Sequence, residues 1–261
     1  MAPQLTLGVD THLDVHVAAL LDERGALLGV ESFATTPDGY KDLLAWARSH
    51  GEVVLAGVEG TGSYGAGLTR HLHAEGVKVL EVDRPNRQRR RRRGKSDPQD
   101  AITAARAAQS GDAQGEAKTR DGNVEAMRVL RVARSSARKA RTQALNQMRS
   151  IISTAPDQIR AELRDLNVYR LLERASAYRP GARRDVASLT KLSLRTLARR
   201  AVALEAEIAD IDVILKELVA DTAPELVARV GIGVESATAL LVAAGDNPGR
   251  LRNEATFAHL C

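Results

Sequence analysis

The chain has 261 residues, of which 44% are apolar and 3% aromatic, and its single Cys is the last residue. This composition is sufficient for one large or two smaller domains with apolar cores. It argues against a base-stacking platform, an internal disulfide framework or a Cys-based zinc site, and fits a reducing, cytoplasmic setting. Because no run approaches the roughly 18 apolar residues of a membrane span and residues 1–7 lack a signal-peptide core, we expect no membrane association.

The positive charge is concentrated in one segment. The formal net charge is +5, but residues 84–149 contain 18 Lys and Arg against 6 Asp and Glu, a net charge of +12, which leaves −7 on the rest of the chain. Such an asymmetry predicts a localised nucleic-acid-binding face.

The first 115 residues alternate between strand-like and helix-like patterns. We expect strands near residues 5–9, 14–21, 26–33, 53–58 and 77–82, and helices that begin at Pro37, near Tyr64 and at Pro98. The first three strands form a meander, and the later apolar strands are joined by crossover helices. This order predicts an α/β domain with a mixed sheet.

Four carboxylates follow elements of this domain. Asp10 ends the first strand, Glu59 ends the fourth strand, and Asp97 and Asp100 stand at the start of the helix at Pro98. If the first and fourth strands are adjacent and parallel, these acids meet at one sheet edge, where Mg2+ (or Mn2+) prefers oxygen ligands. The structural alternatives are a turn residue at Asp10, a loop residue at Glu59, and helix capping by Asp97 and Asp100.

A basic arm at residues 84–95 leads directly into this helix. Its five consecutive arginines have no route into a core, so they form either a solvated segment or an anion-binding arm. The candidate nucleic-acid-binding residues here are Arg84, Arg87, Arg89, Arg90, Arg91, Arg92, Arg93 and Lys95.

Residues 116–221 are expected to be helical. A long helix over residues 123–154 carries a basic side that either binds a phosphate backbone or is an ordinary solvated face, formed by Arg128, Arg131, Arg134, Arg138, Lys139 and Arg141. A further helix is expected over residues 157–172. From residue 185 to about 220, apolar residues recur at alternating steps of three and four, from Leu194 to Leu218. This seam predicts a coiled coil with the first long helix, with another subunit, or, as we expect, with both in a homodimer or tetramer.

The last segment, residues 222–261, predicts a small helical domain. Two helices flank Gly231-Ile232-Gly233, which resembles a helix-hairpin-helix turn whose amides bind phosphate. One more helix is expected from residue 253 to 259, and its abrupt end at Cys261 suggests a truncated chain.

The motifs together resemble the transposases of the insertion-sequence 110 family. The matching segments are Gly8-Val9-Asp10-Thr11-His12, Gly57-Val58-Glu59-Gly60-Thr61-Gly62-Ser63-Tyr64 and Lys95-Ser96-Asp97-Pro98-Gln99-Asp100-Ala101. The resemblance implies a RuvC-like (ribonuclease-H fold) catalytic domain at residues 1–115, a dimerising coiled coil at 116–221 and a partial transposase domain at 222–261. It implies that Asp10, Glu59, Asp97 and Asp100 are catalytic Mg2+ ligands. It also implies donor DNA, target DNA and a structured non-coding bridge RNA as partners, at the bacterial nucleoid.

One feature of that family is missing. Its nucleophilic serine belongs to a C-terminal segment beyond residue 261, and Ser236 stands in a different context, at a helix N-terminus. We therefore expect a DNA transposase or recombinase whose metal site and binding surfaces are present here without the serine needed for strand exchange. The alternatives are a RuvC-like Holliday-junction endonuclease that needs no serine, and a non-catalytic nucleic-acid-binding scaffold.

Overall fold

The computed structural model describes residues 3–82, 96–113, 115–181, 184–251 and 254. Several predicted features lie outside this range: Arg84, Arg87, Arg89, Arg90, Arg91, Arg92, Arg93 and Lys95 of the basic arm, and all but residue 254 of the final helix. The chain forms two compact units, which are described separately. Unit 1 comprises residues 1–125 and 240–261, and unit 2 comprises residues 126–239.

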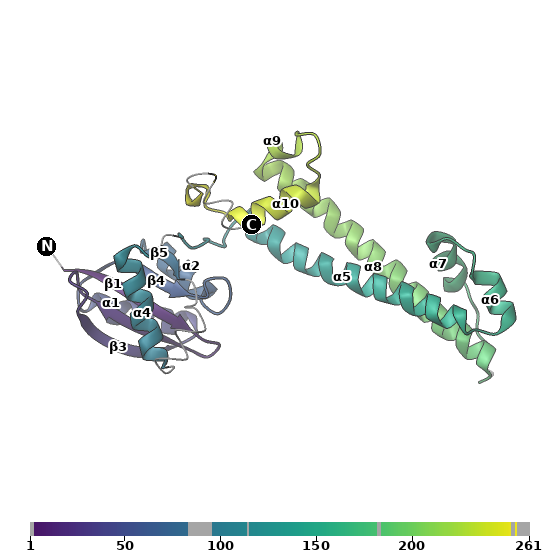
Figure 1. Ribbon diagram of the computed structural model, residues 1–261, viewed down its shortest axis with the longest axis horizontal. Helices are drawn as coiled ribbons and strands as arrows, with labels where there is room; N and C mark the ends of the chain where they lie inside the picture. The colour runs from purple at the N-terminus through teal and green to yellow at the C-terminus, as the bar shows by residue number, and fades with distance from the viewer. Residues whose placement is uncertain (1–2, 83–95, 114, 182–183, 252–253, 255–261) are drawn as a thin grey trace. The chain divides into compact units, whose positions relative to one another are not determined.

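Unit 1 is built on a five-stranded mixed sheet (Figure 1). Its strands are β1 (Gln4–Thr11), β2 (Val15–Leu21), β3 (Leu27–Ala34), β4 (Glu52–Glu59) and β5 (Lys78–Val82), in the order β3-β2-β1-β4-β5. The first three strands pair antiparallel as the predicted meander, whereas β4 is parallel to both β1 and β5. This is the RuvC-like α/β architecture expected from the sequence.

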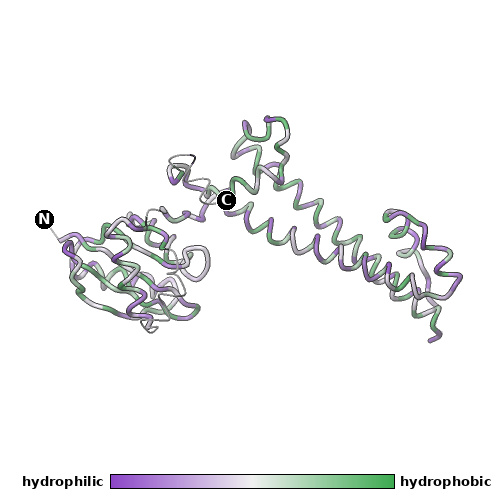
Figure 2. The backbone as a smooth tube through the Cα atoms, viewed as in Figure 1, coloured by the Kyte–Doolittle hydropathy of each residue, from purple (hydrophilic) through white to green (hydrophobic). Residues whose placement is uncertain are grey.

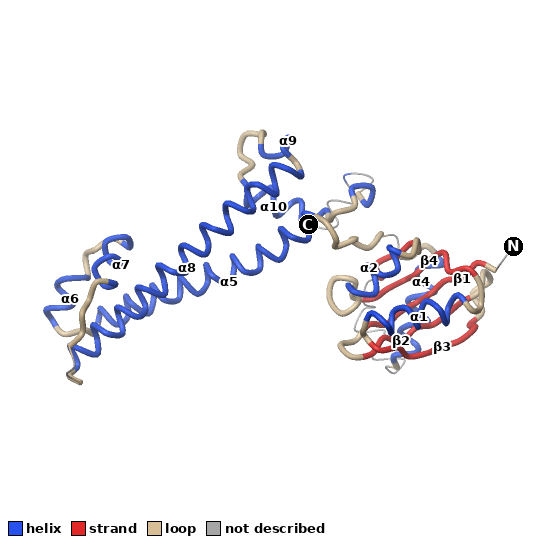
Figure 3. The backbone as a smooth tube through the Cα atoms, turned by 180° about the vertical axis from the view of Figure 1, so that it is seen from behind, coloured by secondary structure: helices blue, strands red, loops and turns tan. Residues whose placement is uncertain are grey.

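Helices cover both faces of the sheet. On one face, Leu5, Leu7 and Val9 of β1 pack with α1 (Pro37–Arg48) and α2 (Ala66–Ala74) in the largest apolar cluster of this unit. On the other face, α4 (Asp97–Ser110) packs through small side chains, including Ala101 and Ala104. Helix α4 is in front of the sheet in Figure 1, and α1 is in front of it in Figure 3, which shows the opposite side. The alternation of side chains along β1 separates the two layers.

The C-terminal part of unit 1 is held against residues 116–125. Arg250 donates from Nε to the carbonyl oxygen of Glu116 at 2.6 Å, and Lys118 donates from Nζ to the carbonyl oxygen of Val242 at 2.6 Å. The Asp246 carboxylate accepts hydrogen bonds from the amides of Val124 and Glu125, at 2.8 and 3.1 Å. These bonds join segments more than a hundred residues apart, within one unit.

Unit 2 contains an antiparallel helical hairpin. Its long helices are α5 (Asn123–Ser153) and α8 (Val186–Thr222), and their ends are joined by α6 (Asp157–Leu163) and α7 (Val168–Ser176). Arg134 pairs with Asp212 and Arg141 pairs with Glu205, so α5 and α8 run in opposite directions along each other. Figure 2 shows apolar and polar stretches alternating along both helices, as expected when each has one apolar side.

Half of the predicted seam of α8 is buried, and the other half is partly buried. Leu194, Ala201, Ile211 and Leu215 are buried within a single chain. The two long helices fold back along each other within one chain. A coiled coil, whether between α5 and α8 or with a second subunit, remains a prediction.

The predicted helix over residues 157–172 is wrong in one respect, because the chain forms two helices there. Asn167 caps the second one, its side-chain oxygen accepting a hydrogen bond from the amide of Arg170 at 3.0 Å. An N-cap residue has extended dihedral angles, so Asn167 cannot continue a helix and starts α7, after α6 has ended at Leu163.

The two helices around Gly231-Ile232-Gly233 are present as α9 (Pro224–Val227) and α10 (Val234–Ala244), followed by the 3-10 turn η1 (Pro248–Arg250). Gly231 has a φ of 87°, a left-handed conformation that favours glycine and allows the tight turn. Within the described residues, no helix is long and apolar enough to traverse a bilayer.

Candidate metal centre

The carboxyl ends of β1 and β4 are neighbours. The two strands are parallel, with Val9 opposite Val58, so Asp10 and Glu59 occupy the next position on each strand. Both residues are nearly inaccessible, at 4% and 3% exposure. The Thr11 hydroxyl donates to the carbonyl oxygen of Glu59 at 2.8 Å, which links the two strand ends directly. Two acids far apart in the sequence thus lie at one edge of the sheet, where ligands bind in open α/β folds.

A pair of glycines explains how α4 reaches this edge. Gly8 and Gly57 are opposite each other on β1 and β4. A Cβ atom on Gly8 would lie 2.2 Å from the carbonyl oxygen of Ala101, and one on Gly57 would lie 2.4 Å from that of Ala104. The backbone of α4 therefore rests directly on the two strands. Since side chains alternate, Asp10 and Glu59 point to the same face as these glycines, two residues further along.

The start of α4 supplies the other two predicted acids. The helix is capped at Ser96, not at Asp97, so the alternative in which Asp97 is the N-cap residue is wrong by one position. Asp97 and Asp100 are both in the first turn, and Asp100 is buried at 8% exposure. In this position the Asp97 carboxylate points toward β1 and takes part in the cluster described next.

His12 connects the strand and the helix. Its Nε2 atom lies 3.1 Å from Oδ2 of Asp10 and 3.5 Å from Oδ1 of Asp97. Potential ligand atoms of Asp10, His12 and Asp97 all lie within 4.8 Å of one another. This is close enough for one cation to contact all three, and all three are residue types that coordinate transition-metal ions.

The four predicted acids are therefore arranged in two groups. Asp10 and Asp97 belong to the 4.8 Å cluster with His12, whereas Glu59 and Asp100 are not members of it. Asp100 lies close enough to raise the pKa of Asp10, and Glu59 is on the adjacent strand. Sequence reasoning missed His12 as a candidate ligand. The available signal was its spacing, since residues two apart at a strand end project to the same side.

The pKa of Asp10 reflects its surroundings. Burial raises this pKa above its ordinary value, and the negative charges of Asp100 and Asp97 raise it further, while His12 opposes the shift. Burial and like charges both disfavour the ionised carboxylate, and a nearby cation favours it. A divalent cation bound here would therefore stabilise the ionised form of Asp10 against burial and against the charges of Asp97 and Asp100.

The donor atoms fit such a cation. Carboxylate oxygens suit Mg2+ and Mn2+, and an added imidazole nitrogen favours Mn2+ or another transition metal over Mg2+. A pair of ions about 4 Å apart needs several bridging and flanking carboxylates, and the predicted ligands Glu59 and Asp100 remain candidates for that role. The residues present therefore match divalent metal use, and the identity of the metal stays a proposal.

A RuvC-like sheet with acids gathered at the ends of β1 and β4 defines a class of nucleic-acid-processing proteins. The particular family follows from sequence comparison. A model of the insertion-sequence 110 transposases with a DEDD site, described as "Transposase", matches residues 7–157. This match covers more than half of the chain, and the chain belongs to that transposase family. No curated protein matches the chain.

The predicted basic side of α5 divides into two groups. Arg134 is 15% exposed and pairs with Asp212 and Glu235, each at 2.5 Å, while Arg131 lies 3.5 Å from Glu235. Arg141 pairs with Glu205 at 3.1 Å. These three arginines face acids of α8 and α10, and Arg128 also has an interaction within the protein. Arg138 and Lys139, in contrast, are exposed on α5.

Proposed function

We propose that the β1–β4 edge of unit 1 is the metal-dependent site for DNA strand cleavage in a transposase reaction, and that strand exchange also requires the nucleophilic serine of the family's C-terminal segment. Asp10, Glu59, Asp97 and Asp100 would be the catalytic carboxylates, and His12 would join them in holding Mg2+ or Mn2+. The single observation that carries the proposal is the convergence of Asp10 and Asp97 on His12 within 4.8 Å. A divalent cation at such a site stabilises negative charge on the oxygens of a scissile phosphate.

The chain itself would position these groups. β1 and β4 hold Asp10 and Glu59 in a buried setting, and α4 brings Asp97 and Asp100 to them over Gly8 and Gly57. His12 bridges Asp10 and Asp97, so it would keep the strand acid and the helix acid at a constant separation. This preorganisation favours catalysis because ligands already in place need no reorganisation during reaction.

Further partners belong to the same proposal. Membership of a transposase family implies DNA binding, and we propose donor and target DNA together with a structured bridge RNA as partners. The arm residues and the exposed Arg138 and Lys139 would contact phosphates, since clustered cations bind nucleic acid through its backbone. We also propose that unit 2 forms a homodimer through its helical hairpin.

The direct test is metal binding by an isosteric variant. We expect Mn2+ titrated into the protein to bind with an affinity that Asp97→Asn reduces at least about tenfold, because a neutral amide replaces one charged ligand. The matched control is Asp38→Asn, which alters another aspartate in the first turn of a helix, exposed at 87% and paired only with Lys41 among the described residues. Equal Mn2+ affinities for the wild type and Asp97→Asn would contradict the site.

Activity is the second readout. A plasmid carrying a full-length coding sequence that includes the family's C-terminal serine segment, with its natural flanking DNA, is introduced into cells, and excised or inserted copies are detected by amplification across the junctions. We expect Asp97→Asn and Asp10→Asn to abolish these products while Asp38→Asn retains them. Normal product formation by a correctly folded Asp97→Asn protein would refute a catalytic role for this carboxylate.

A further inference from the structure

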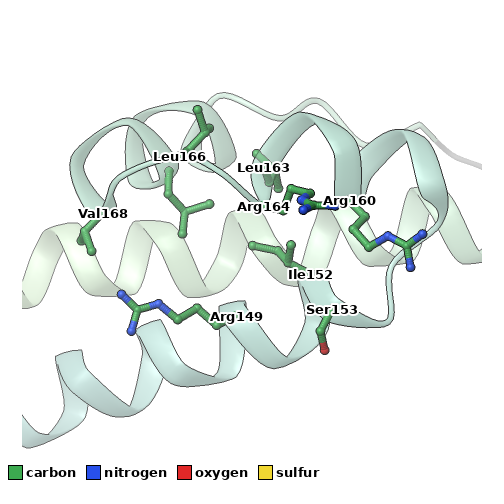
Figure 4. A pocket seen from close by; sticks show the side chains of 9 residues that line it. Arg149, Ile152, Ser153, Arg160, Leu163, Arg164, Leu166 and Val168 are labelled. Atoms are coloured by element: carbon green, nitrogen blue, oxygen red, sulfur yellow. The ribbon is translucent and has the colours of Figure 1, made fainter.

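A pocket lies in unit 2, at the end of the hairpin where α6 and α7 connect α5 to α8. It has a volume of about 440 Å³ and is formed by the C-terminal end of α5, by α6, by the connection after α6 and by α7. Figure 4 shows Ile152 of α5 facing Leu163 and Leu166, with Arg149 and Arg160 on opposite sides of the opening. The volume is within the range of small-ligand sites.

The floor of the pocket is aliphatic. Ile152, Leu163 and Leu171 are 5%, 1% and 4% exposed and belong to the apolar cluster of the hairpin end. Leu166 and Val168 pack against this cluster and are partly buried. Five aliphatic side chains thus offer a water-poor surface, which favours the flat apolar body of a ligand over a fully hydrated ion.

The rim of the pocket is cationic. Arg149, Arg160 and Arg164 line it, and none of the nine lining residues is acidic. Arg160 pairs with Asp157 at 2.6 Å and Arg164 with Asp165 at 3.3 Å, but these carboxylates are 90% and 83% exposed. Ion pairs with such exposed partners contribute little free energy, so an incoming anion displaces them at small cost.

The surrounding segment is also positively charged. Residues 149–200 contain 12 Lys and Arg against 5 Asp and Glu, a net charge of +7. A field of this sign attracts a polyanion. Arginine forms bidentate hydrogen bonds with phosphate, which makes a phosphate group the best match for three guanidinium groups around one opening.

We propose that this pocket receives one unstacked nucleotide of a single-stranded nucleic acid. The base would enter the aliphatic floor, and the flanking phosphates would lie against Arg149, Arg160 and Arg164. A nucleotide combines the two features that the pocket selects, an apolar ring and an adjacent anion, and extruded bases are held in apolar pockets in this way. The volume of about 440 Å³ suits one such group, whereas a protein helix needs an extended groove.

The proposal is tested with a fluorescent base analogue. Single-stranded DNA of about 12 nucleotides, and RNA of the same sequence, each carry one 2-aminopurine at successive positions. Its fluorescence rises when the base leaves the stack, so we expect an increase at specific positions on binding to the full chain. The polymer that shows the larger increase identifies whether DNA or RNA occupies the pocket.

Two variants and one control distinguish binding in the pocket from general electrostatic attraction of the nucleic acid. Arg149→Glu is expected to weaken binding about tenfold, as for loss of a charge-assisted hydrogen bond. Arg170→Glu, on an exposed arginine of α7 outside the pocket lining, makes the same charge change and is expected to have a markedly smaller effect. Val168→Trp fills the apolar floor and is expected to abolish the 2-aminopurine increase with little loss of salt-dependent binding.

An increase in fluorescence that is lost in Val168→Trp and reduced in Arg149→Glu supports the proposal. An equal effect of Arg149→Glu and Arg170→Glu, or no increase at any position with either polymer, overturns it. Circular dichroism of each variant reports folding, and because Arg149 is exposed its replacement tests the pocket even if Val168→Trp fails to fold. This test needs no metal, so it is independent of the proposed function of unit 1.

Discussion

Two histidines four residues apart on the chain have different surroundings. His12 is 39% exposed in its side chain and contacts Asp10 and Asp97, where an imidazole can act as a ligand. His16 is completely buried, stacks on Tyr40 at 5.7 Å and has Oγ1 of Thr35 3.5 Å from its Nδ1 atom. Burial and the proximity of His12 lower the pKa of His16 to about 4. The same residue type thus serves a candidate metal site in one position and the core in the other.

The buried His16 predicts a pH dependence of stability. Its pKa is about 4 in the folded protein, and about 6.5 when unfolded, so the unfolded chain binds more protons between these values. Stability therefore falls as the pH drops from 6.5 toward 4, by up to about 3 kcal/mol from this group. Urea denaturation at several pH values measures the effect. His16→Phe keeps a ring beside Tyr40 and is expected to remove this part of the pH dependence; an unchanged profile would show that other groups are responsible.

Among the secondary-structure elements, the contact between α4 and the sheet has the most direct bearing on the site. Gly8 and Gly57 leave no space for side chains, and α4 contributes Ala101, Ala104, Ala105 and Ala108 at this contact. The close approach brings the first turn of α4, with Asp97 and Asp100, to the ends of β1 and β4. Small residues in the strands thereby determine where the acids of the helix lie.

Enlarging one of these glycines is expected to disturb both stability and the site. In Gly8→Ala the new methyl group would overlap the backbone of α4, so α4 must move away from β1. We expect a loss of about 1–3 kcal/mol in unfolding free energy, as for overpacked cores, together with weaker Mn2+ binding. Gly115→Ala is the matched control, because a Cβ there meets no atom within 4 Å. Equal Mn2+ affinity in Gly8→Ala and the wild type would mean that the position of α4 does not determine the site.

In unit 2, arginines of α5 that pair with acids of α8 are expected to stabilise the fold, whereas exposed arginines of α5 are expected to bind DNA. Arg134→Ala removes hydrogen bonds to Asp212 and Glu235 from a largely buried guanidinium group, and we expect a cost of about 2 kcal/mol in stability. Arg138→Ala alters an exposed side chain on the same helix and is expected to change stability by less than about 0.5 kcal/mol while weakening DNA binding. Thermal unfolding and DNA-binding titrations measure the two effects, and the reverse pattern would contradict this division.

At the scale of the whole molecule, the two units have different kinds of surface. Unit 1 encloses its core between helices on both sides of the sheet. Unit 2 is a thin hairpin that leaves large apolar side chains exposed on α5 and α8, including Val129 at 51%, Val132 at 61%, Val213 at 58% and Ile214 at 45%. Exposed apolar side chains on both long helices make this hairpin a candidate association surface.

These side chains predict how the proposed dimer can be disrupted. We expect light scattering to give twice the monomer mass for the wild type, and the monomer mass for Val213→Asp combined with Ile214→Asp, because each new carboxylate would be buried in the interface. Val186→Asp, at a residue 72% exposed at the start of α8, is the control and is expected to leave the mass unchanged. A wild-type protein that is monomeric at all concentrations would contradict the proposed dimer.

The sequence by itself determined the local structure and the family. Short apolar or alternating runs predicted the five strands, the 3–4 spacing predicted positions of α8 of which half are buried, and three motifs indicated the transposase family. These features depend on residues near one another along the chain, where periodicity and capping act directly. The same reasoning failed at residues 164–167, because the capping role of Asn167 competes with a continuous helix.

Only the tertiary structure decided how distant residues meet. It placed Asp10 beside Glu59 through the parallel pairing of β1 and β4, and it brought His12 between Asp10 and Asp97. It also showed that Arg134 and Arg141 face acids of α8, and that residues 240–251 pack with residues 116–125. Each of these contacts joins segments distant in sequence, and their geometry depends on the packing of whole elements, which no local pattern specifies.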